Sequence, residues 1–241
     1  MLKLQSSYIT ESDGHAMTKR WLSERKQEKY YRLAKKYDYR SRASFKLMQI
    51  DDRFEVLEEG DSVVDLGASP GGWLQVAKER VGDDGIVIGV DLRPIKPLEG
   101  VTTILGDITH QETMQALLDI IGGYADVILS DMAPNIGGNY STDHARSVHL
   151  CTYAISVAEQ ILKRDGRMIM KVFMGDMFPG LKGMMEKRFQ SVKVHEPKAT
   201  RETSSEVYVI AKGFKALPPT ISIEIDDEEE EKKFTVKGDL S

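Results

Sequence analysis

The most informative stretch of this sequence is Asp65-Leu66-Gly67-Ala68-Ser69-Pro70-Gly71-Gly72-Trp73. It follows a short apolar run at 62–64 and leads into a helical pattern of apolar residues at 74, 76 and 77. A strand, a glycine-rich turn and a helix in this order form the first unit of a nucleotide-binding α/β sheet. Glycines let the backbone approach a ligand closely, and the N-terminus of the helix offers free N–H groups. The sequence therefore predicts a ligand-binding loop.

The spacing of these glycines departs from the G-x-G-x-x-G pattern of dinucleotide-binding proteins. The Pro-Gly-Gly-Trp ending narrows the passage and adds a large aromatic side chain, which suits a compact nucleoside better than a pyrophosphate. The loop resembles motif I of the methyltransferases that use S-adenosylmethionine (SAM). With Trp73 it is most similar to the FtsJ/RrmJ family of RNA ribose 2′-O-methyltransferases. The resemblance implies a Rossmann-like SAM-dependent methyltransferase fold.

Apolar runs and helical patterns alternate regularly from residue 61 onward. Strands are expected at 62–66, 86–90, 101–105, 125–130, 167–173, 191–195 and 206–212, and helices at 72–81, 111–121, 143–164 and 179–189. This alternation predicts an α/β fold in which a seven-stranded, mostly parallel sheet has helices on both faces. In the family that the loop resembles, the last strand is antiparallel to the others.

The composition limits the classes of protein to which the chain can belong. Its 241 residues suffice for one substantial α/β domain. No apolar run approaches the roughly 20 residues of a membrane helix, and the polar first residues do not form a signal peptide. Cys151, the only cysteine, excludes an internal disulfide and is expected to be a buried structural thiol. The histidines lack metal-ligand spacing, so we expect no metal site. The composition as a whole fits a cytoplasmic enzyme without a membrane partner.

The net charge of −5 hides two segments of opposite character. Residues 217–241 hold eight acidic and three basic side chains, which leaves 1–216 neutral with 30 of each sign. Within the neutral part, eleven basic residues face three acidic ones between 19 and 46. The basic residues are Lys19, Arg20, Arg25, Lys26, Lys29, Arg32, Lys35, Lys36, Arg40, Arg42 and Lys46. A basic stripe on a neutral body favours RNA as a partner, although a solvated helix face has the same composition.

Four segments follow from these patterns. We expect a loose N-terminal tail at 1–16, a basic helical extension packed on the core at 17–55, a methyltransferase domain at 56–214 and an acidic, flexible tail at 215–241. Within the extension, helices are expected at 21–36 and 41–54, with Ser41 or Ser44 as the cap of the second. Met17 opens the more regular part and is a candidate start of translation. Tyr30, Tyr31, Tyr37 and Tyr39 lie between the basic residues, either to stack on bases or to pack on the domain.

Several acidic residues follow directly after strand runs, where ligands of parallel sheets bind. Asp91 ends the second strand and is placed to accept hydrogen bonds from ribose hydroxyls, while Asp107 is placed to accept from an adenine amino group. Each could instead be an ordinary turn residue. The resemblance implies that SAM is held by Gly71, Trp73, Asp91, Asp107 and Asp131. Asp65 is expected to order the loop by accepting backbone N–H bonds near the methionine amino group.

Methyl transfer to a hydroxyl needs positioning of the acceptor and removal of its proton. Asp131 and Lys171 each end an apolar strand run, so both are expected at the carboxyl edge of the sheet. A lysine in so hydrophobic a strand is costly unless it is paired or functional. Lys46 lies in Ser-Arg-Ala-Ser-Phe-Lys-Leu and Glu206 in Thr-Ser-Ser-Glu-Val-Tyr. By resemblance, Lys46, Asp131, Lys171 and Glu206 form the Lys-Asp-Lys-Glu tetrad of the family.

Two roles for Lys171 remain open at this point. It either removes the 2′-hydroxyl proton, or it orients the hydroxyl and stabilises the developing negative charge. Desolvation and a nearby Lys46 favour a neutral amine, whereas Asp131 and Glu206 favour an ammonium. Asp131 is expected to hold Lys171 and favour the sulfonium, while Lys46 and Glu206 align the ribose.

The functional prediction is a SAM-dependent methyltransferase that modifies a ribose 2′-hydroxyl, with uridine in 23S-type large-subunit rRNA as the leading acceptor. Related enzymes modify the anticodon loop of tRNA, so tRNA is an alternative substrate. A non-catalytic RNA-binding or ribosome-assembly factor is disfavoured by the intact tetrad, and a dinucleotide-dependent oxidoreductase by the loop spacing. Methyltransferases that act on planar amines use Asn/Asp-Pro-Pro-Tyr/Phe, whereas this chain has Asp-Met-Ala-Pro at 131–134.

Overall fold

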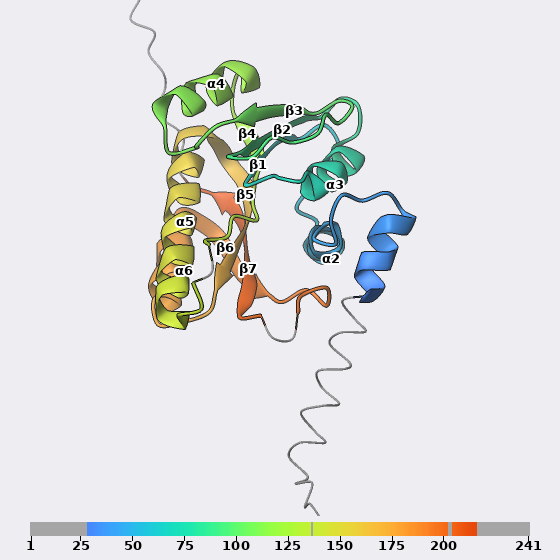
Figure 1. Ribbon diagram of the computed structural model, residues 1–241. Helices are drawn as coiled ribbons and strands as arrows, with labels where there is room; N and C mark the ends of the chain where they lie inside the picture. The colour runs from blue at the N-terminus through green and yellow to red at the C-terminus, as the bar shows by residue number, and fades with distance from the viewer. Residues whose placement is uncertain (1–27, 136, 202–203, 216–241) are drawn as a thin grey trace, which may run out of the picture.

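The computed structural model describes residues 28–135, 137–201 and 204–215 (Figure 1). The predicted tail at 1–16, the first part of the extension at 17–27 and nearly all of the predicted acidic tail at 215–241 lie outside the described residues. No helix in the described ranges is long and apolar enough to cross a membrane.

One seven-stranded sheet forms the centre of the molecule, in the order β3-β2-β1-β4-β5-β7-β6. The strands are β1 (Ser62–Leu66), β2 (Ile86–Asp91), β3 (Thr102–Leu105), β4 (Ala125–Ser130), β5 (Leu162–Phe173), β6 (Phe189–His195) and β7 (Glu206–Phe214). Strands β1 to β5 pair in parallel, while β7 runs antiparallel to both β5 and β6. The predicted fold class, including the antiparallel last strand, is therefore confirmed.

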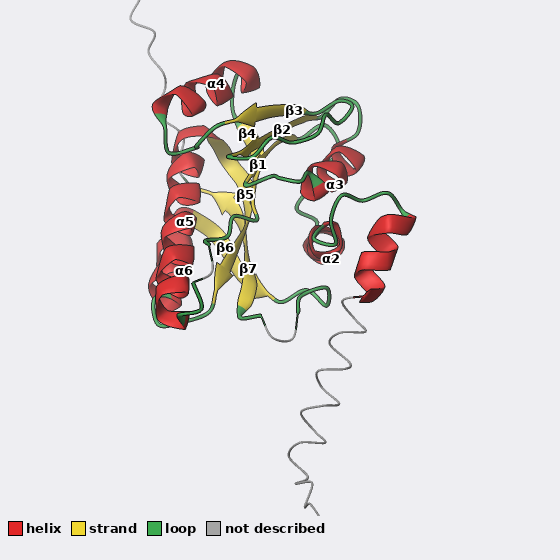
Figure 2. Cartoon of the chain, viewed as in Figure 1, coloured by secondary structure: helices red, strands yellow, loops and turns green. Residues whose placement is uncertain are grey.

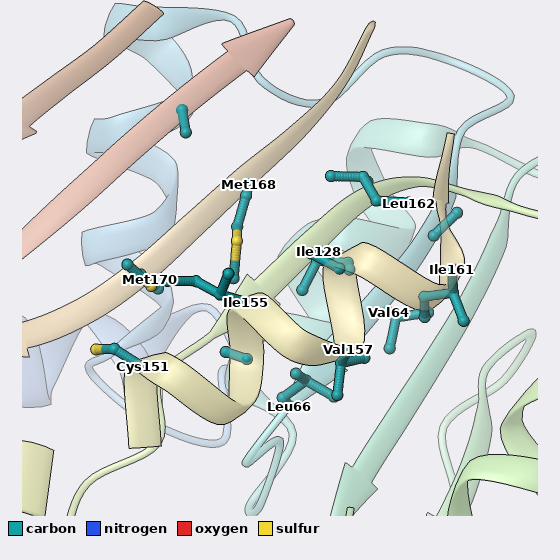
Figure 3. Close-up of a cluster of buried hydrophobic side chains, with 14 of the residues drawn as sticks. Val64, Leu66, Ile128, Cys151, Ile155, Val157, Ile161, Leu162, Met168 and Met170 are labelled. Atoms are coloured by element: carbon teal, nitrogen blue, oxygen red, sulfur yellow. The ribbon is translucent and has the colours of Figure 1, made fainter. Parts of the chain in front are cut away.

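Helices cover both faces of this sheet (Figure 2). The helices α2 (Ser44–Phe54) and α3 (Gly72–Val81) and the helical residues 28–36 lie on one face, and α4 (Gln111–Ile121), α5 (Tyr140–Ile161) and α6 (Phe178–Arg188) lie on the other. Each face has its own apolar cluster. Figure 3 shows part of the cluster beneath α4, α5 and α6, where α5 places Ile155 and Ile161 against Ile128 of β4 and Met168 of β5. Burial on both faces explains why the central strands read as continuous apolar runs.

The junction of α5 and β5 differs from the sequence prediction. The helix begins at Tyr140, after Asn139 accepts a 3.1 Å hydrogen bond from the backbone N–H of Thr142. It ends at Ile161, because Leu162 already pairs with Ala125 of β4. The register then shifts, with a left-handed backbone at Asp165 (φ 61°), before regular pairing resumes at Arg167. The prediction of a helix up to residue 164 followed an apolar helical periodicity that extends beyond Ile161, where the pairing of β5 with β4 begins.

The capping prediction for the second helix of the extension was wrong. This helix begins at Ser44 and its N-cap is Ala43, which makes no side-chain capping bond. The Ser44 hydroxyl instead donates a 3.0 Å hydrogen bond to the carbonyl of Gly72 in the glycine-rich loop. A Cβ on Gly72 would come within 2.3 Å of the Ser41 hydroxyl. Both serines therefore pack against the loop, and only glycine fits at position 72 because the serine hydroxyls lie so close to its Cα.

Candidate active site

Five ionisable side chains gather at one edge of the sheet. Asp91, Asp65 and Lys171 lie at or near the carboxyl ends of the strands β2, β1 and β5, and Asp131 follows β4. Glu206 is the first residue of β7, and the antiparallel direction of that strand brings its start to the same edge. Because these strands are neighbours in the order β2-β1-β4-β5-β7, the five side chains form a continuous row. This is the edge where parallel α/β sheets bind ligands.

Lys171 and Asp131 form the first pair of this row. The Lys171 ammonium donates to the Asp131 backbone carbonyl at 2.6 Å and lies 2.9 Å from its carboxylate Oδ1. The lysine side chain is buried, whereas that of Asp131 is 22% exposed. Two acceptors thus fix the ammonium, which leaves one of its three hydrogens for an acceptor hydroxyl at the mouth of the site.

Lys46 of α2 and Glu206 form the second pair, a hydrogen-bonded ion pair between buried side chains. Glu206 faces Phe173 and Tyr208 faces Lys171 across the β5–β7 ladder, so both pairs lie on the same face of the sheet. The structure therefore brings together all four residues of the predicted tetrad. The two pairs share Tyr208: its hydroxyl donates to Asp131 at 3.0 Å, and the Lys46 nitrogen lies 5.6 Å from its ring centroid.

Tyr208 is the site residue that the sequence prediction missed. Burial, followed by the charges of Asp131 and Glu206, raises the pKa of its phenol well above the ordinary value. The phenol therefore remains protonated and donates to Asp131 throughout the physiological pH range. The strand alternation contains the signal, because position 208 shares a face with Glu206 two residues earlier.

Asp65 is fully buried, and neither of its carboxylate oxygens has a hydrogen-bond partner among the described residues. Burial raises the pKa of Asp65 well above its usual value, and the charges of Asp131 and Asp91 add to this effect, while Lys171 opposes it. The expectation that Asp65 accepts N–H bonds from the loop was wrong. Asp91 makes that contact instead, by accepting the Ser69 N–H at 2.8 Å. An unpaired buried carboxylate beside two others fits a cationic ligand.

SAM carries a sulfonium and an ammonium, so its charge suits this acidic part of the edge. The remaining predicted contacts are partly engaged within the protein. Asp91 also accepts the Arg93 N–H at 2.8 Å. Asp107 accepts from the N–H and hydroxyl of Thr109, and these bonds lower the pKa of its carboxyl group. Both carboxylates are therefore oriented by their own loops, and the residues present fit the cofactor.

The side chain of Trp73 lies in the core rather than in an open cofactor site. It is 3% exposed, donates through its indole Nε1 to the Ala43 carbonyl at 2.9 Å and packs 5.8 Å from the Tyr208 ring. Its backbone N–H lies in the first turn of α3 and is the group that can face a ligand. Gly71, with φ 105°, makes the turn that opens this helix end.

Arg40 ties the N-terminal extension to the glycine-rich loop. Its guanidinium donates to three backbone carbonyls, those of Pro70 at 3.2 Å, Lys96 at 2.5 Å and Pro97 at 2.7 Å. Its own N–H donates to the Gln75 side chain of α3 at 2.8 Å. The extension thus holds the loop against the 95–98 segment that follows Asp91.

Replacing Arg40 by glutamine is expected to weaken SAM binding about tenfold, because the three hydrogen bonds that hold the loop against the 95–98 segment are lost. The Kd for SAM, measured by calorimetry without RNA, checks this. Arg32→Gln is the matched control, since within the described residues the Arg32 side chain bonds only Glu28, on the exposed side of the same extension. An Arg40→Gln protein that binds SAM within twofold of the wild type would show that the hydrogen bonds of Arg40 are not needed for SAM binding.

Cys151 is a buried structural thiol, as predicted. Burial raises the pKa of Cys151 to about 12, and its Sγ donates to the Lys171 carbonyl at 3.2 Å. Within the ranges that the structure covers, no three His, Cys, Asp or Glu side chains are grouped to hold a metal ion.

Comparison with known proteins agrees with this geometry. The sequence profile of the FtsJ-like methyltransferase family matches residues 39–214. The "Ribosomal RNA large subunit methyltransferase E" of Methanocaldococcus jannaschii is 48% identical over 201 residues, covering 81% of this chain and 82% of the relative. The protein of the same name from Methanosarcina barkeri is 52% identical over 190 residues, covering 78% and 72%.

The fold also matches a crystal structure from Plasmodium falciparum, of a protein assigned as a ribosomal RNA methyltransferase. That structure has a TM-score of 0.67 and 31% sequence identity, and the match covers 73% of this chain and 98% of the other. SAM is the methyl donor of the family, in agreement with the acidic row and the glycine-rich loop. Because the family profile spans most of the chain, this protein belongs to the FtsJ-like methyltransferases.

Proposed function

We propose that this enzyme methylates a ribose 2′-hydroxyl in large-subunit rRNA. The observation that carries the proposal is the Lys171–Asp131 pair, which leaves one ammonium hydrogen beside the second pair, Lys46–Glu206. Such an arrangement suits a hydroxyl acceptor, since it offers the hydroxyl both a hydrogen-bond donor and a carboxylate. The names of the archaeal relatives support large-subunit rRNA as the substrate.

SAM supplies the electrophilic methyl group when it is bound. We propose that Gly71, Asp91 and Asp107 hold it, together with the backbone of Trp73 and the carboxylate of Asp131. Asp65 lies behind them, where its unpaired carboxylate favours the positive charge of the ligand. In this proposal, these side-chain and backbone groups bind and orient the cofactor, and none of them takes a proton from the acceptor.

Lys171 in this proposal orients the acceptor hydroxyl and stabilises the negative charge that develops on its oxygen. Its ammonium is held by two contacts with Asp131, one to the backbone carbonyl and one to the carboxylate. The Tyr208 hydroxyl donates to the same Asp131 oxygen, Oδ1, that the ammonium contacts, and so helps to orient this carboxylate. Lys46 and Glu206 align the ribose.

The extension at 17–55 is proposed to bind the RNA backbone, and its described part supports this. Tyr31 and Tyr37 are 55% and 58% exposed, and the ammonium groups of Lys35 and Lys36 lie over their rings. Tyr30 and Tyr39 pack instead on Phe45. The pairs of exposed aromatic and basic side chains are of the kind that holds single-stranded RNA.

A second group of positive charges lies nearer the tetrad. Burial lowers the pKa of the Arg42 guanidinium, and the nearby charge of Arg201 lowers it further. Two cations that repel each other beside a catalytic edge are stabilised by a phosphate. We propose the cytoplasm as the location of the enzyme, in keeping with an rRNA substrate.

The substrate is tested by transfer of labelled methyl groups from SAM to purified rRNA, assembled large subunits and bulk tRNA. We expect label in large-subunit rRNA, and its loss with Lys171→Ala. Label in tRNA alone would replace the substrate, while SAM binding without transfer to any of these RNAs would favour a binding factor.

A further inference from the structure

A cavity of about 350 Å³ lies beside the tetrad and has no part in the chemistry described above. Its walls come from the segment that leads into α5, from the end of β5 and from the loop before β7. Figure 1 shows the start of α5 and this loop at the same end of the molecule. The lining residues are Gly138, Tyr140, Asp143, Phe173, Arg201, Ser204 and Ser205. Its volume is in the range of small-molecule sites.

The cavity lies at the right distance from Lys171 to receive a group attached to the same ribose. Phe173 is two residues beyond Lys171 on β5, so the two side chains share a face and are separated by about 6.6 Å along the strand. Ser205 directly precedes Glu206. A ribose whose 2′-hydroxyl contacts Lys171 would carry its base over this short distance, because the base is attached to the neighbouring ring carbon.

The aromatic part of the wall is held in place before any ligand arrives. Tyr140 is 61% exposed, yet its hydroxyl donates to the Met174 carbonyl at 2.5 Å. The segment around Met174 is itself fixed by His144. The Nδ1–H of His144 donates to the Phe173 carbonyl at 2.9 Å. In this tautomer the Nε2 atom of His144 accepts from the Met177 N–H. A rigid, exposed ring is a suitable surface on which a base stacks.

The polar part of the wall consists mainly of hydrogen-bond donors. Asp143 is the one carboxylate among the lining residues, and its two oxygens accept the N–H groups of Gly137 and Gly138 at 2.9 and 3.1 Å. Arg201 and Ser205 also line the cavity, and their guanidinium and hydroxyl groups can donate to a ligand. Uracil carries a carbonyl acceptor at C4, where cytosine carries an amino donor, so a guanidinium that reaches this position favours uracil.

We propose that this cavity binds the base of the acceptor nucleotide, with Tyr140 as a stacking surface and Arg201 as the donor that selects uracil over cytosine. The proposal rests on the proposed function, because it assumes that the acceptor is a nucleotide in RNA. It adds the base as a recognised group and assigns the selection of the nucleotide to residues outside the tetrad.

The test uses short RNAs that contain the acceptor position, once nucleoside mapping of methylated rRNA has located it. Three versions carry uridine, cytidine or an abasic ribose there, and single-turnover rates are measured at saturating SAM. With uridine, Tyr140→Ala is expected to be about tenfold slower than the wild type, as for the loss of one stacked base. With the abasic ribose the two enzymes should be equally fast, since no base remains to stack. Arg201→Gln should reduce the preference for uridine over cytidine to near unity.

Two variants keep the test interpretable. Tyr153→Ala removes an exposed tyrosine of the same helix that stacks on His149 outside the cavity, and should leave all three rates unchanged. Tyr140→Phe retains the ring and should retain most of the rate. An equal loss on uridine and abasic RNA, or an unchanged preference in Arg201→Gln, would overturn the base site. A wild-type enzyme that transfers to no RNA would instead overturn the proposed function, and the base site with it.

Discussion

Lys171→Ala is expected to lower the rate of methyl transfer by about 10³-fold or more while SAM still binds. The substitution removes the ammonium that we propose contacts the acceptor oxygen, and groups of this kind supply rate factors of about 10² to 10⁴. Asp131 keeps the hydrogen bond from Tyr208, so its carboxylate is not left without a partner. Single-turnover transfer to rRNA, together with the Kd for SAM, measures both effects.

Two further lysine variants separate the possible roles of Lys171. Lys171→Arg retains a cation with several donors but cannot serve as a base, since a guanidinium does not lose its proton in proteins. We expect this variant to be clearly faster than Lys171→Ala. Equal rates in the two variants would assign the base role to Lys171, and near-normal turnover of Lys171→Ala would exclude both roles. Lys182→Ala, which removes one partner of an exposed i,i+4 ion pair, is the matched control.

Asp65→Asn is expected to weaken SAM binding by roughly 2–3 kcal/mol, which raises the Kd by about 30- to 150-fold. The substitution keeps the shape of the side chain but removes the buried carboxyl group, which can give up its proton to the solvent and pair with a cationic ligand when that ligand binds. Calorimetric titration with SAM measures this change. Asp119→Asn, an exposed position on α4, serves as the control.

The same substitution changes how the stability of the ligand-free protein depends on pH. The pKa of Asp65 is raised in the folded state, so between its unfolded value near 3.8 and the folded value the folded protein binds more protons than the unfolded chain. The free energy of unfolding therefore falls as the pH rises through this window, by up to about 1.4 kcal/mol per pH unit. In Asp65→Asn this decline should be absent. Denaturant unfolding between pH 4 and 8 measures it, and parallel curves for both proteins would contradict the assignment.

The elements that carry the fold could be predicted because their apolar periodicity is strong and uninterrupted. The strands β1 and β4 and the helix α3 begin and end at the predicted residues. The boundary between α5 and β5 could not be predicted, since it depends on the pairing of Leu162 with a strand that is distant in the sequence. Ser41 and Ser44 had the right residue type for a cap, but contact with the glycine-rich loop determined their position.

The candidate site was predictable where position in the chain determines position in space. Residues that follow parallel strands must lie at the carboxyl edge, and this places Asp91, Asp131 and Lys171 together. Partners across the sheet were harder to predict. Tyr208 joins the two ion pairs only through the register between β5 and β7, and the unpaired state of Asp65 depends on every group around it. Sequence spacing indicates proximity, but hydrogen-bond partners depend on packing in three dimensions.

The proposed acceptor of the methyl group is a ribose 2′-oxygen of large-subunit rRNA. Nucleoside mass spectrometry after reaction of that RNA with the enzyme and isotopically labelled SAM identifies the methylated atom. We expect labelled 2′-O-methyluridine that is absent after reaction with Lys171→Ala. Label on a base, or label that persists in the Lys171→Ala reaction, would contradict it.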